Sequence, residues 1–104
     1  MRKAKVFVNG IEAGVLSEIE QGAEYVFEYN EGYDGLEVSR TMLPSQKKHK
    51  YNKFPPFFEG LLPEGIQLEG LLKLNKIDRN DLFSQLIVIG EDMVGAVTIK
   101  EIIE

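Results

Sequence analysis

The stretch from Phe54 to Gly65 restricts most strongly what this chain can fold into. It holds three prolines and two glycines among three phenylalanines and two leucines. Proline removes a backbone donor and glycine weakens both helix and strand, so the stretch is neither one regular helix nor a central strand. A helix is expected to begin near Pro63, where proline suits the first turn and Glu64 faces the positive end of the helix dipole. The apolar side chains can either plug a core or form a binding edge, and composition favours the core.

The length of 104 residues predicts a single domain, residues 1–104, with one hydrophobic core. The absence of cysteine excludes disulfides and thiolate metal sites and fits a reducing compartment. No apolar run approaches the roughly 20 residues that a membrane span needs. The residues after Met1 do not form the apolar core of an export signal. We therefore expect a cytoplasmic protein without membrane contact.

Charge is distributed unevenly along the chain, whose net charge is -5. Eight acidic residues and no lysine or arginine lie between Val6 and Ser39. Five basic residues and no acid lie in the segment from Arg40 to Lys53. Proteins that bind nucleic acid rely on clustered cations, so the acidic part argues against direct nucleic-acid binding. The basic segment is interpreted as a solvated loop, with contact to an acidic partner as the alternative.

Alternating apolar residues predict a meander of three strands. The first strand runs to Val8, and Asn9-Gly10 is the preferred pair for a tight hairpin turn. The expected strands are Lys3–Val8, Ile11–Ile19 with a bulge at Ala13-Gly14, and Ala23–Tyr29 with Tyr25, Phe27 and Tyr29 on one face. A short edge or barrel-closing strand is expected at Leu36–Ser39, followed by weak order from Arg40 to Lys53.

Helical spacing replaces this alternation after Pro63. Leu68, Leu71 and Leu72 define a predicted buried face, which places Ile66 and Gly70 nearly opposite. Asp78 and Asp81 are expected to cap a second helix that ends at Gly90 and buries Leu82, Phe83, Leu86 and Ile87. A last strand is expected within Gly95–Ile103. The prediction is an α+β fold: a small antiparallel sheet or partly closed barrel, a C-terminal helical hairpin and a returning last strand.

The sequence offers almost no catalytic groups. Its one histidine, His49, lies among lysines without a neighbouring acid to orient it. There is no nucleophile elbow, no glycine-rich phosphate loop followed by lysine, and no cluster of histidine or cysteine with metal-ligand spacing. We therefore predict no enzyme activity, no catalytic residues, no cofactor and no metal. The density of phenylalanine, proline and leucine between Phe54 and Gly65 favours a module that works by surface contact.

Two long motifs extend this interpretation. Phe57–Gly65 reads FFEGLLPEG, and Ile89–Val97 reads IGEDMVGAV. Together with the shorter pieces Gly14–Leu16, Phe27–Tyr29 and Ser39–Pro44, they resemble, in order and spacing, the N-terminal subdomain of the HipA-type serine/threonine kinase toxins. In that family a kinase core follows the subdomain, whereas this sequence contains neither a kinase catalytic loop nor a metal-binding aspartate motif.

The resemblance implies a function. A free-standing subdomain of this type is similar to the HipS antitoxins of the tripartite HipBST toxin–antitoxin systems. The implied partners are a HipT-like kinase toxin, which the module would bind and inhibit, and a HipB-like DNA-binding protein in a larger complex. Two alternatives stay open: a split N-terminal piece that completes the fold of a HipA kinase, and an accessory protein that assists operator binding by the DNA-binding partner.

The predicted partner-binding site is the start of the helix after Pro63. We hypothesise that Ile66 with Gln67 inserts into the kinase at or near its catalytic cleft, because a tight turn would hold Ile66 rigidly. Phe57 and Phe58 would anchor the loop or widen the contact. A lone exposed isoleucine is also common and needs no functional explanation. The candidate site residues are Phe57, Phe58, Leu61, Leu62, Pro63, Glu64, Gly65, Ile66 and Gln67.

Overall fold

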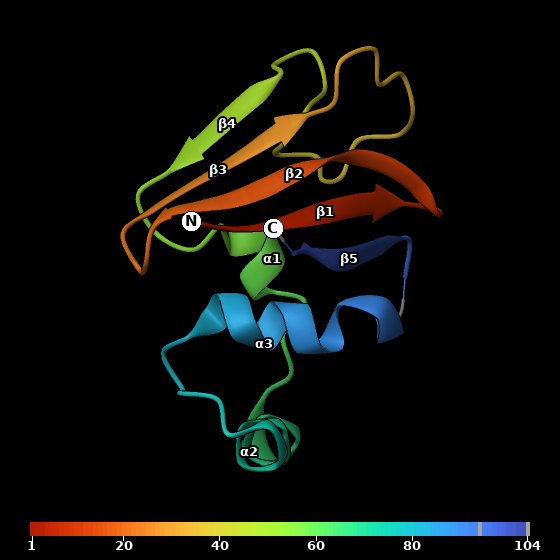
Figure 1. The fold of residues 1–104 in the computed structure, drawn as a ribbon. Coiled ribbons are helices and arrows are strands. Elements are labelled where there is room, and N and C mark those ends of the chain that lie inside the picture. Colours follow the sequence, from red (N-terminus) through yellow and green to blue (C-terminus); the bar gives the residue numbers. More distant parts are fainter. Residues whose placement is uncertain (94, 104) are drawn as a thin grey trace.

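A computed structural model describes residues 1–93 and 95–103 of the chain (Figure 1). One antiparallel sheet has the strand order β4-β3-β2-β1-β5. The strands are β1 (Arg2–Val8), β2 (Ile11–Glu20), β3 (Glu24–Tyr29), β4 (Lys48–Tyr51) and β5 (Val97–Ile102). The helices are α1 (Pro56–Glu59), α2 (Gly65–Asn75), α3 (Leu82–Ile89) and a 3-10 turn, η1 (Gly90–Asp92). The expected α+β fold is confirmed, and the sheet is open, with β4 and β5 at opposite edges.

The first hairpin forms as the sequence predicts. Asn9 and Gly10 both have positive φ, 51° and 81°, as the tight turn between β1 and β2 requires. The predicted bulge is also present: Val6 lies opposite Gly14 and Phe7 opposite Glu12, so Ala13 is the extra residue. Glycine is required at position 14, because a Cβ there would lie 2.3 Å from the carbonyl oxygen of Glu28.

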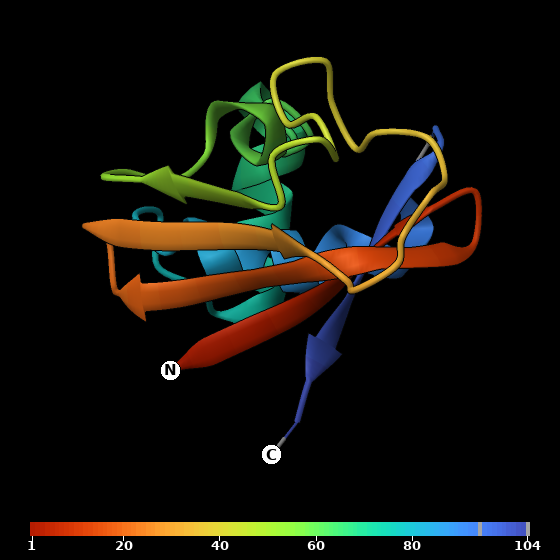
Figure 2. The ribbon, with the colours of Figure 1, turned by 90° about the horizontal axis from the view of Figure 1, so that it is seen from above.

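The core lies between the sheet and the helices beneath it. Tyr25, Phe27 and Tyr29 are buried on one face of β3, as their alternation predicts. The core also takes side chains from the other strands and from the helices: Ala4, Val6, Val8, Leu16, Ile99, Phe58, Phe83 and Leu86. Figure 2, which shows the sheet from above, makes clear how its strands fan out from β4 to β5 with the usual twist.

The fourth strand is not where it was predicted. Leu36–Ser39 forms no strand, apart from an isolated bridge between Ser39 and Met42. Instead, β4 lies inside the segment from Arg40 to Lys53 that was expected to have weak order, and it pairs with β3. The prediction failed because it rested on the polar composition and missing periodicity of the segment, and neither reports contacts with other parts of the chain.

Two aromatic rings give this segment its order. The Tyr29 hydroxyl donates to the carbonyl of Met42 and accepts from the Val38 amide at 3.0 Å, and Met42 is fully buried. His49 is also buried, and its Nε2 lies 3.0 Å from the carbonyl oxygen of Leu43. These tertiary hydrogen bonds pair the backbone amide of Val38 and the carbonyls of Met42 and Leu43, and they anchor a loop that is otherwise mostly exposed.

The helices occupy two levels below the sheet (Figure 1). α1 and α3 lie next to the sheet, whereas α2 lies beyond α3, on the side away from the strands. The two consecutive helices that the sequence predicted are present as α2 and α3. They cross rather than lie side by side: in Figure 1, α3 runs across the view while α2 is seen along its axis. The predicted last strand is confirmed as β5, which pairs antiparallel with β1, while Val94 lies outside the described residues.

Candidate protein-binding surface

The first half of the proline-rich connector enters the core. Phe58 on α1 is fully buried, and its ring centroid lies 6.1 Å from that of Phe27. Phe54 is also buried and meets the Tyr25 ring edge-on at 5.3 Å. α1 itself was not predicted, although Pro56 at its first position suits a helix start. This half of the connector therefore plugs the core, and the Phe58 side chain is not available at the surface.

The second half of the connector turns outward. Leu61, Leu62 and Pro63 are half-buried, whereas Glu64 is exposed. Gly65 has a φ of +60°, in the left-handed region that favours glycine, and α2 begins there rather than at Pro63. The connector thus changes direction at Gly65 and sends α2 away from the sheet.

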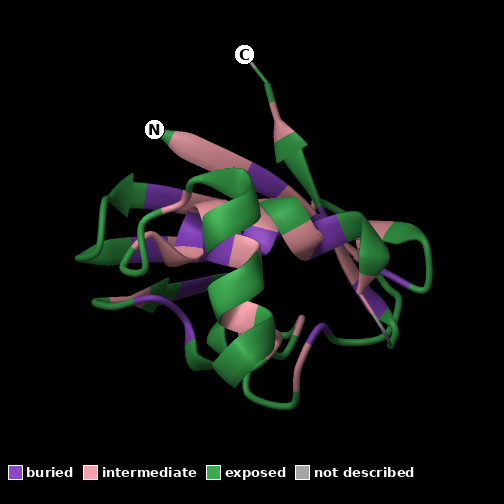
Figure 3. Cartoon of the chain, turned by 90° about the horizontal axis from the view of Figure 1, so that it is seen from below, coloured by how far each residue is buried: buried purple, intermediate pink, exposed green. Residues whose placement is uncertain are grey.

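α2 is an apolar helix that is mostly exposed. Leu72 is its only buried residue, and Leu68 and Leu71, which were also expected to be buried, are half-buried. Ile66 is 91% exposed, in the position opposite the inner face that the sequence predicts, and Gln67 beside it is exposed too. Figure 3, seen from the side where α2 lies, shows most of this helix in green, the colour of exposed residues. A helix with apolar residues on all sides is ordinarily enclosed by other elements.

The exposed side of α2 carries a second apolar residue that the sequence analysis missed. Ile66, Gly70 and Leu74 are spaced four residues apart, so at about 100° per residue they fall within roughly 80° of arc. Leu74 is 86% exposed, and a Cβ at Gly70 would have nothing within 4 Å. We call these three residues the α2 stripe. The spacing i, i+4, i+8 was the signal that could have identified Leu74.

The loop after α2 is held by a buried amide. α2 ends at Asn75 and is capped by Lys76, whose φ of 54° is left-handed, and the Ile77 amide donates to the Leu72 carbonyl at 3.0 Å. Gln85 on α3 is buried, and its Nε2 donates to the carbonyls of Asp78 and Arg79 at 3.3 and 3.0 Å. These bonds tie the loop between the helices to α3, so they hold the C-terminal end of α2 in place.

α3, in contrast, is tied to the sheet by a network of charges. Arg2 on β1 donates to Glu18 on β2 at 2.6 Å, to Asp81 at 2.8 Å and to Ser84 at 2.8 Å. The hydrogen bond with Glu18 is the main reason why the pKa of Arg2 is raised. Burial acts to raise the pKa of Asp81, but hydrogen bonds from Arg2 and Ser84 outweigh it and leave that pKa lowered. Tyr25 completes the network by donating to Glu18 at 3.0 Å.

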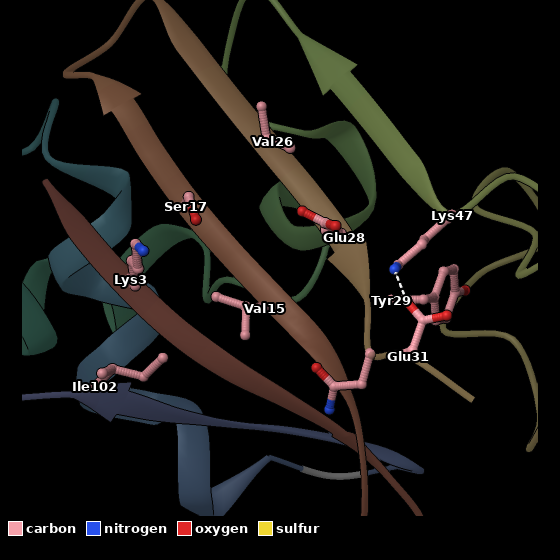
Figure 4. A pocket seen from close by; sticks show the side chains of 10 residues that line it. Lys3, Val15, Ser17, Val26, Glu28, Tyr29, Glu31, Lys47 and Ile102 are labelled. Atoms are coloured by element: carbon pink, nitrogen blue, oxygen red, sulfur yellow. Dashed lines mark hydrogen bonds and ion pairs between the residues drawn. The ribbon is translucent and has the colours of Figure 1, made fainter. Parts of the chain in front are cut away.

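The outer face of the sheet has a shallow hollow of about 420 Å³ (Figure 4). Lys3, Ser17 and Glu28 stand apart on neighbouring strands, and Lys47 at the rim is paired with Glu31. These polar side chains do not converge on one point. Within residues 1–93 and 95–103, no three histidine, cysteine or acidic side chains are placed to hold a metal ion. Nor does any described helix have the length and apolar character to cross a membrane.

Comparison with known proteins gives the family. Residues 4–100 match the model of the HipA N-terminal domain. The fold is similar to a solved structure of the N-terminal domain of HipA toxin, with a TM-score of 0.78 and 30% identity, covering 100% of this chain and 95% of that one. An uncharacterized protein of Haemophilus influenzae is 35% identical over 101 residues, which are 97% of this chain and 93% of that protein. The chain therefore belongs to the HipA N-terminal domain family.

Proposed function

We propose that this chain is a non-catalytic, antitoxin-like module that binds and inhibits a HipA-family serine/threonine kinase toxin of the HipT-like kind. Membership of the HipA N-terminal domain family supports a role beside such a kinase. The observation that carries the proposal is the α2 stripe. It is an apolar surface on a helix that the rest of the chain leaves mostly uncovered.

The stripe has the properties of a binding anchor. Burial of one isoleucine or leucine side chain contributes about 1.5–3 kcal/mol, so Ile66 and Leu74 together offer several kcal/mol to a partner that covers them. The helix is already formed in the free chain, so its ordering costs little on binding. Gly70 lies between the two side chains without a side chain of its own, and a partner can approach the helix closely there.

Ile66 is the proposed point of insertion into the kinase. It lies in the first turn of α2, directly after the Gly65 turn, and it projects away from the chain's own core. Ile66 and Gln67 would enter the kinase at or near its catalytic cleft. The half-buried Phe57, Leu61, Leu62 and Pro63 would border the contact with Glu64 and Gly65, and Phe58 would support it from the core.

The wider assembly is part of the same proposal. A HipB-like DNA-binding protein would join the complex in the cytoplasm and supply the contact with DNA. The net charge of -5 makes direct nucleic-acid binding by this chain unfavourable. Inhibition would need no catalytic group on this chain, in keeping with the scattered charges of its outer face.

The test uses a HipA-family kinase from the same genome that lacks its own N-terminal subdomain. We expect the parent chain to suppress autophosphorylation of this kinase, and Ile66→Asp to weaken binding at least roughly thirtyfold, because a charge would enter an apolar contact. Ile11→Asp is the matched control: Ile11 is 61% exposed beside the turn between β1 and β2, far along the chain from α2. Calorimetry would give the affinities, and kinase assays the inhibition.

Two other results would point to a different function or to a different contact surface. If the parent chain stimulates the kinase instead of suppressing it, the chain is a split piece that completes the kinase fold. If folded Ile66→Asp still binds and silences the kinase like the parent, the α2 stripe is not the contact. The basic segment from Arg40 to Lys53 would then be the next surface to test.

A further inference from the structure

A groove runs along α3 beside the free edge of β5. It consists of two adjoining hollows of about 290 Å³ each, which share Ile87, Val88 and Glu101. No residue of the α2 stripe lines either hollow. The apolar lining of the groove comes from α3, from β5 and the residue after it, and from the loop before α3: Ile77, Phe83, Ile87, Val88, Ile99 and Ile103. Val88 is 41% exposed and Ile103 is 87% exposed, so part of this lining is open to solvent.

The register of β5 shows which backbone groups face the groove. The Asn9 amide donates to the Ala96 carbonyl at 2.8 Å, and Val8 lies opposite Val97. In an antiparallel pair, hydrogen-bonded positions alternate, so every second residue of β5 turns its N–H and C=O away from β1. Those residues are Val97, Ile99 and Glu101. Among residues 1–93 and 95–103, no other strand pairs with these backbone groups, which form the edge of the sheet.

One part of this edge is already covered. A Cβ on Gly90, in η1, would lie only 2.5 Å from the carbonyl oxygen of Ile99, so η1 packs directly against the edge at that point. Glu101 lies beyond η1 and is exposed. The outward N–H and C=O of Glu101 are therefore the open end of the edge, beside Val88 and Ile103.

The rim of the groove is acidic. Glu91 and Asp92 on η1 and Glu101 on β5 line it, and none of the three pairs with a cation among residues 1–93 and 95–103. Arg2, at the other end of the groove, is bound to Glu18 and Asp81. Lys100 is the other cation that lines the groove. Thr98, two residues earlier on the same face of β5, is uncharged.

We propose that this groove binds an extended segment of a partner protein, which adds a strand to the β5 edge through Glu101. On the side that faces α3, the segment carries an apolar residue flanked by basic residues two positions away. The apolar side chain packs on Ile87 and Val88, and the basic side chains meet the acidic rim. Successive residues of a strand point to opposite faces, so only every second residue of the segment has to be apolar or basic.

The probe is a seven-residue peptide, capped at both ends, with lysine at its second and sixth positions, valine at its fourth and threonine elsewhere. Two control peptides are used: one has valine at the third position, which moves it to the opposite face, and one has glutamate for lysine. Binding to the full chain is followed through backbone amide shifts in NMR spectra. We expect the probe to shift the amides of Val88 and Glu101, and both controls to bind at least tenfold more weakly.

Two substitutions at one site separate charge from backbone. Glu101→Ala removes the carboxylate and keeps the N–H, whereas Glu101→Pro removes both. Proline is tolerated there because the Glu101 N–H points away from β1 and contributes no bond to the sheet. We expect Glu101→Ala to weaken the probe, and Glu101→Pro to weaken it by roughly a further fivefold, the effect of one hydrogen bond. Val88→Asp should remove binding, with Ile11→Asp as the matched control.

Three results would overturn the proposal. The first is that the glutamate peptide binds as well as the probe, and the second is that Glu101→Pro binds like Glu101→Ala. The third is that the chain dimerises through this edge in sedimentation experiments and Glu101→Pro makes it monomeric, because a second copy would then be the occupant. None of these measurements involves the kinase, so the outcome is independent of the proposed function.

Discussion

α2 and α3 are neighbours in the chain and both are rich in apolar residues, yet only α3 is built into the core. α3 spans eight residues and buries Phe83, Gln85 and Leu86. α2 spans eleven residues and buries Leu72 alone. Apolar content therefore does not decide whether a helix is covered by its own chain. What remains uncovered on α2 is the surface most available to another protein.

The ends of the two helices differ in the same way. The N-cap of α3 is Asp81, whose side chain accepts a hydrogen bond from the Ser84 amide at 3.2 Å and is bound by Arg2 from β1. The N-cap of α2 is Glu64, whose side chain makes no capping bond. Capping and the arginine contact join α3 to two strands, whereas α2 depends on the turn at Gly65 and the loop at Lys76. A docked partner would supply the packing that α2 lacks.

The largest difference between α2 and α3 should appear in the free energy of unfolding when one buried side chain on each helix is truncated. Phe83→Ala is expected to lower the free energy of unfolding by about 3–5 kcal/mol, since it opens a cavity in the core. Leu72→Ala is expected to cost about 2 kcal/mol or less, because its surroundings are half-exposed and can adjust. Urea denaturation of both variants measures this. Equal losses would show that α2 is as much part of the folded core as α3.

This contrast also marks what the sequence could reveal. The hairpin at Asn9-Gly10, the bulge at Ala13 and the buried face of β3 follow from local rules, and all three are confirmed. β4 was missed because its order depends on contacts between segments: Tyr29 on β3 bonds to Met42, and His49 on β4 reaches back to Leu43 in the loop before the strand. Long-range hydrogen bonds of this kind leave no periodicity in the segment that they stabilise.

The sequence predicted only part of the candidate site, again because local patterns do not show which elements come into contact. The exposure of Ile66 follows from helical geometry, given where the leucines lie. Leu68 and Leu71 were expected to be buried, but periodicity shows only which face is apolar and not whether the chain has anything to cover it. The role of Gln85 in holding the interhelical loop could not be seen from sequence, because a buried glutamine is recognised only by its partners.

The tether between α3 and the sheet gives a pH-dependent difference of intermediate size. The pKa of Asp81 is lowered in the folded chain, so its contribution is present above its unfolded value, near 4, and is lost as the pH falls through the folded pKa. Asp81→Asn keeps a capping side chain and loses the charge. We expect this variant to be about 1–2 kcal/mol less stable than the parent at pH 7.

The gap between parent and variant should narrow as the pH falls below about 4, where the carboxylate of the unfolded chain takes up a proton, and close once the folded carboxylate is protonated as well. Urea denaturation at pH 7, 5 and 2.5 measures the gap directly. A gap of the same size at pH 2.5 as at pH 7 would show that the charge of Asp81 does not hold α3 to β1. Ile66→Asp, on α2, serves as a control in which no such tether is lost.

The smallest effect should come from the exposed side of α2 and should have the opposite sign. Glycine is the weaker helix former, and a Cβ at Gly70 would meet nothing within 4 Å. Gly70→Ala is therefore expected to raise the free energy of α2 opening by about 0.5–1 kcal/mol, as measured by amide hydrogen exchange. Gly14→Ala is the matched contrast, because its Cβ would clash with the Glu28 carbonyl and destabilise the chain.

If Gly70→Ala slows exchange in α2 yet weakens binding of the kinase, the partner approaches the helix closely at Gly70. If it slows exchange and leaves binding unchanged, the contact depends on Ile66 and Leu74 alone.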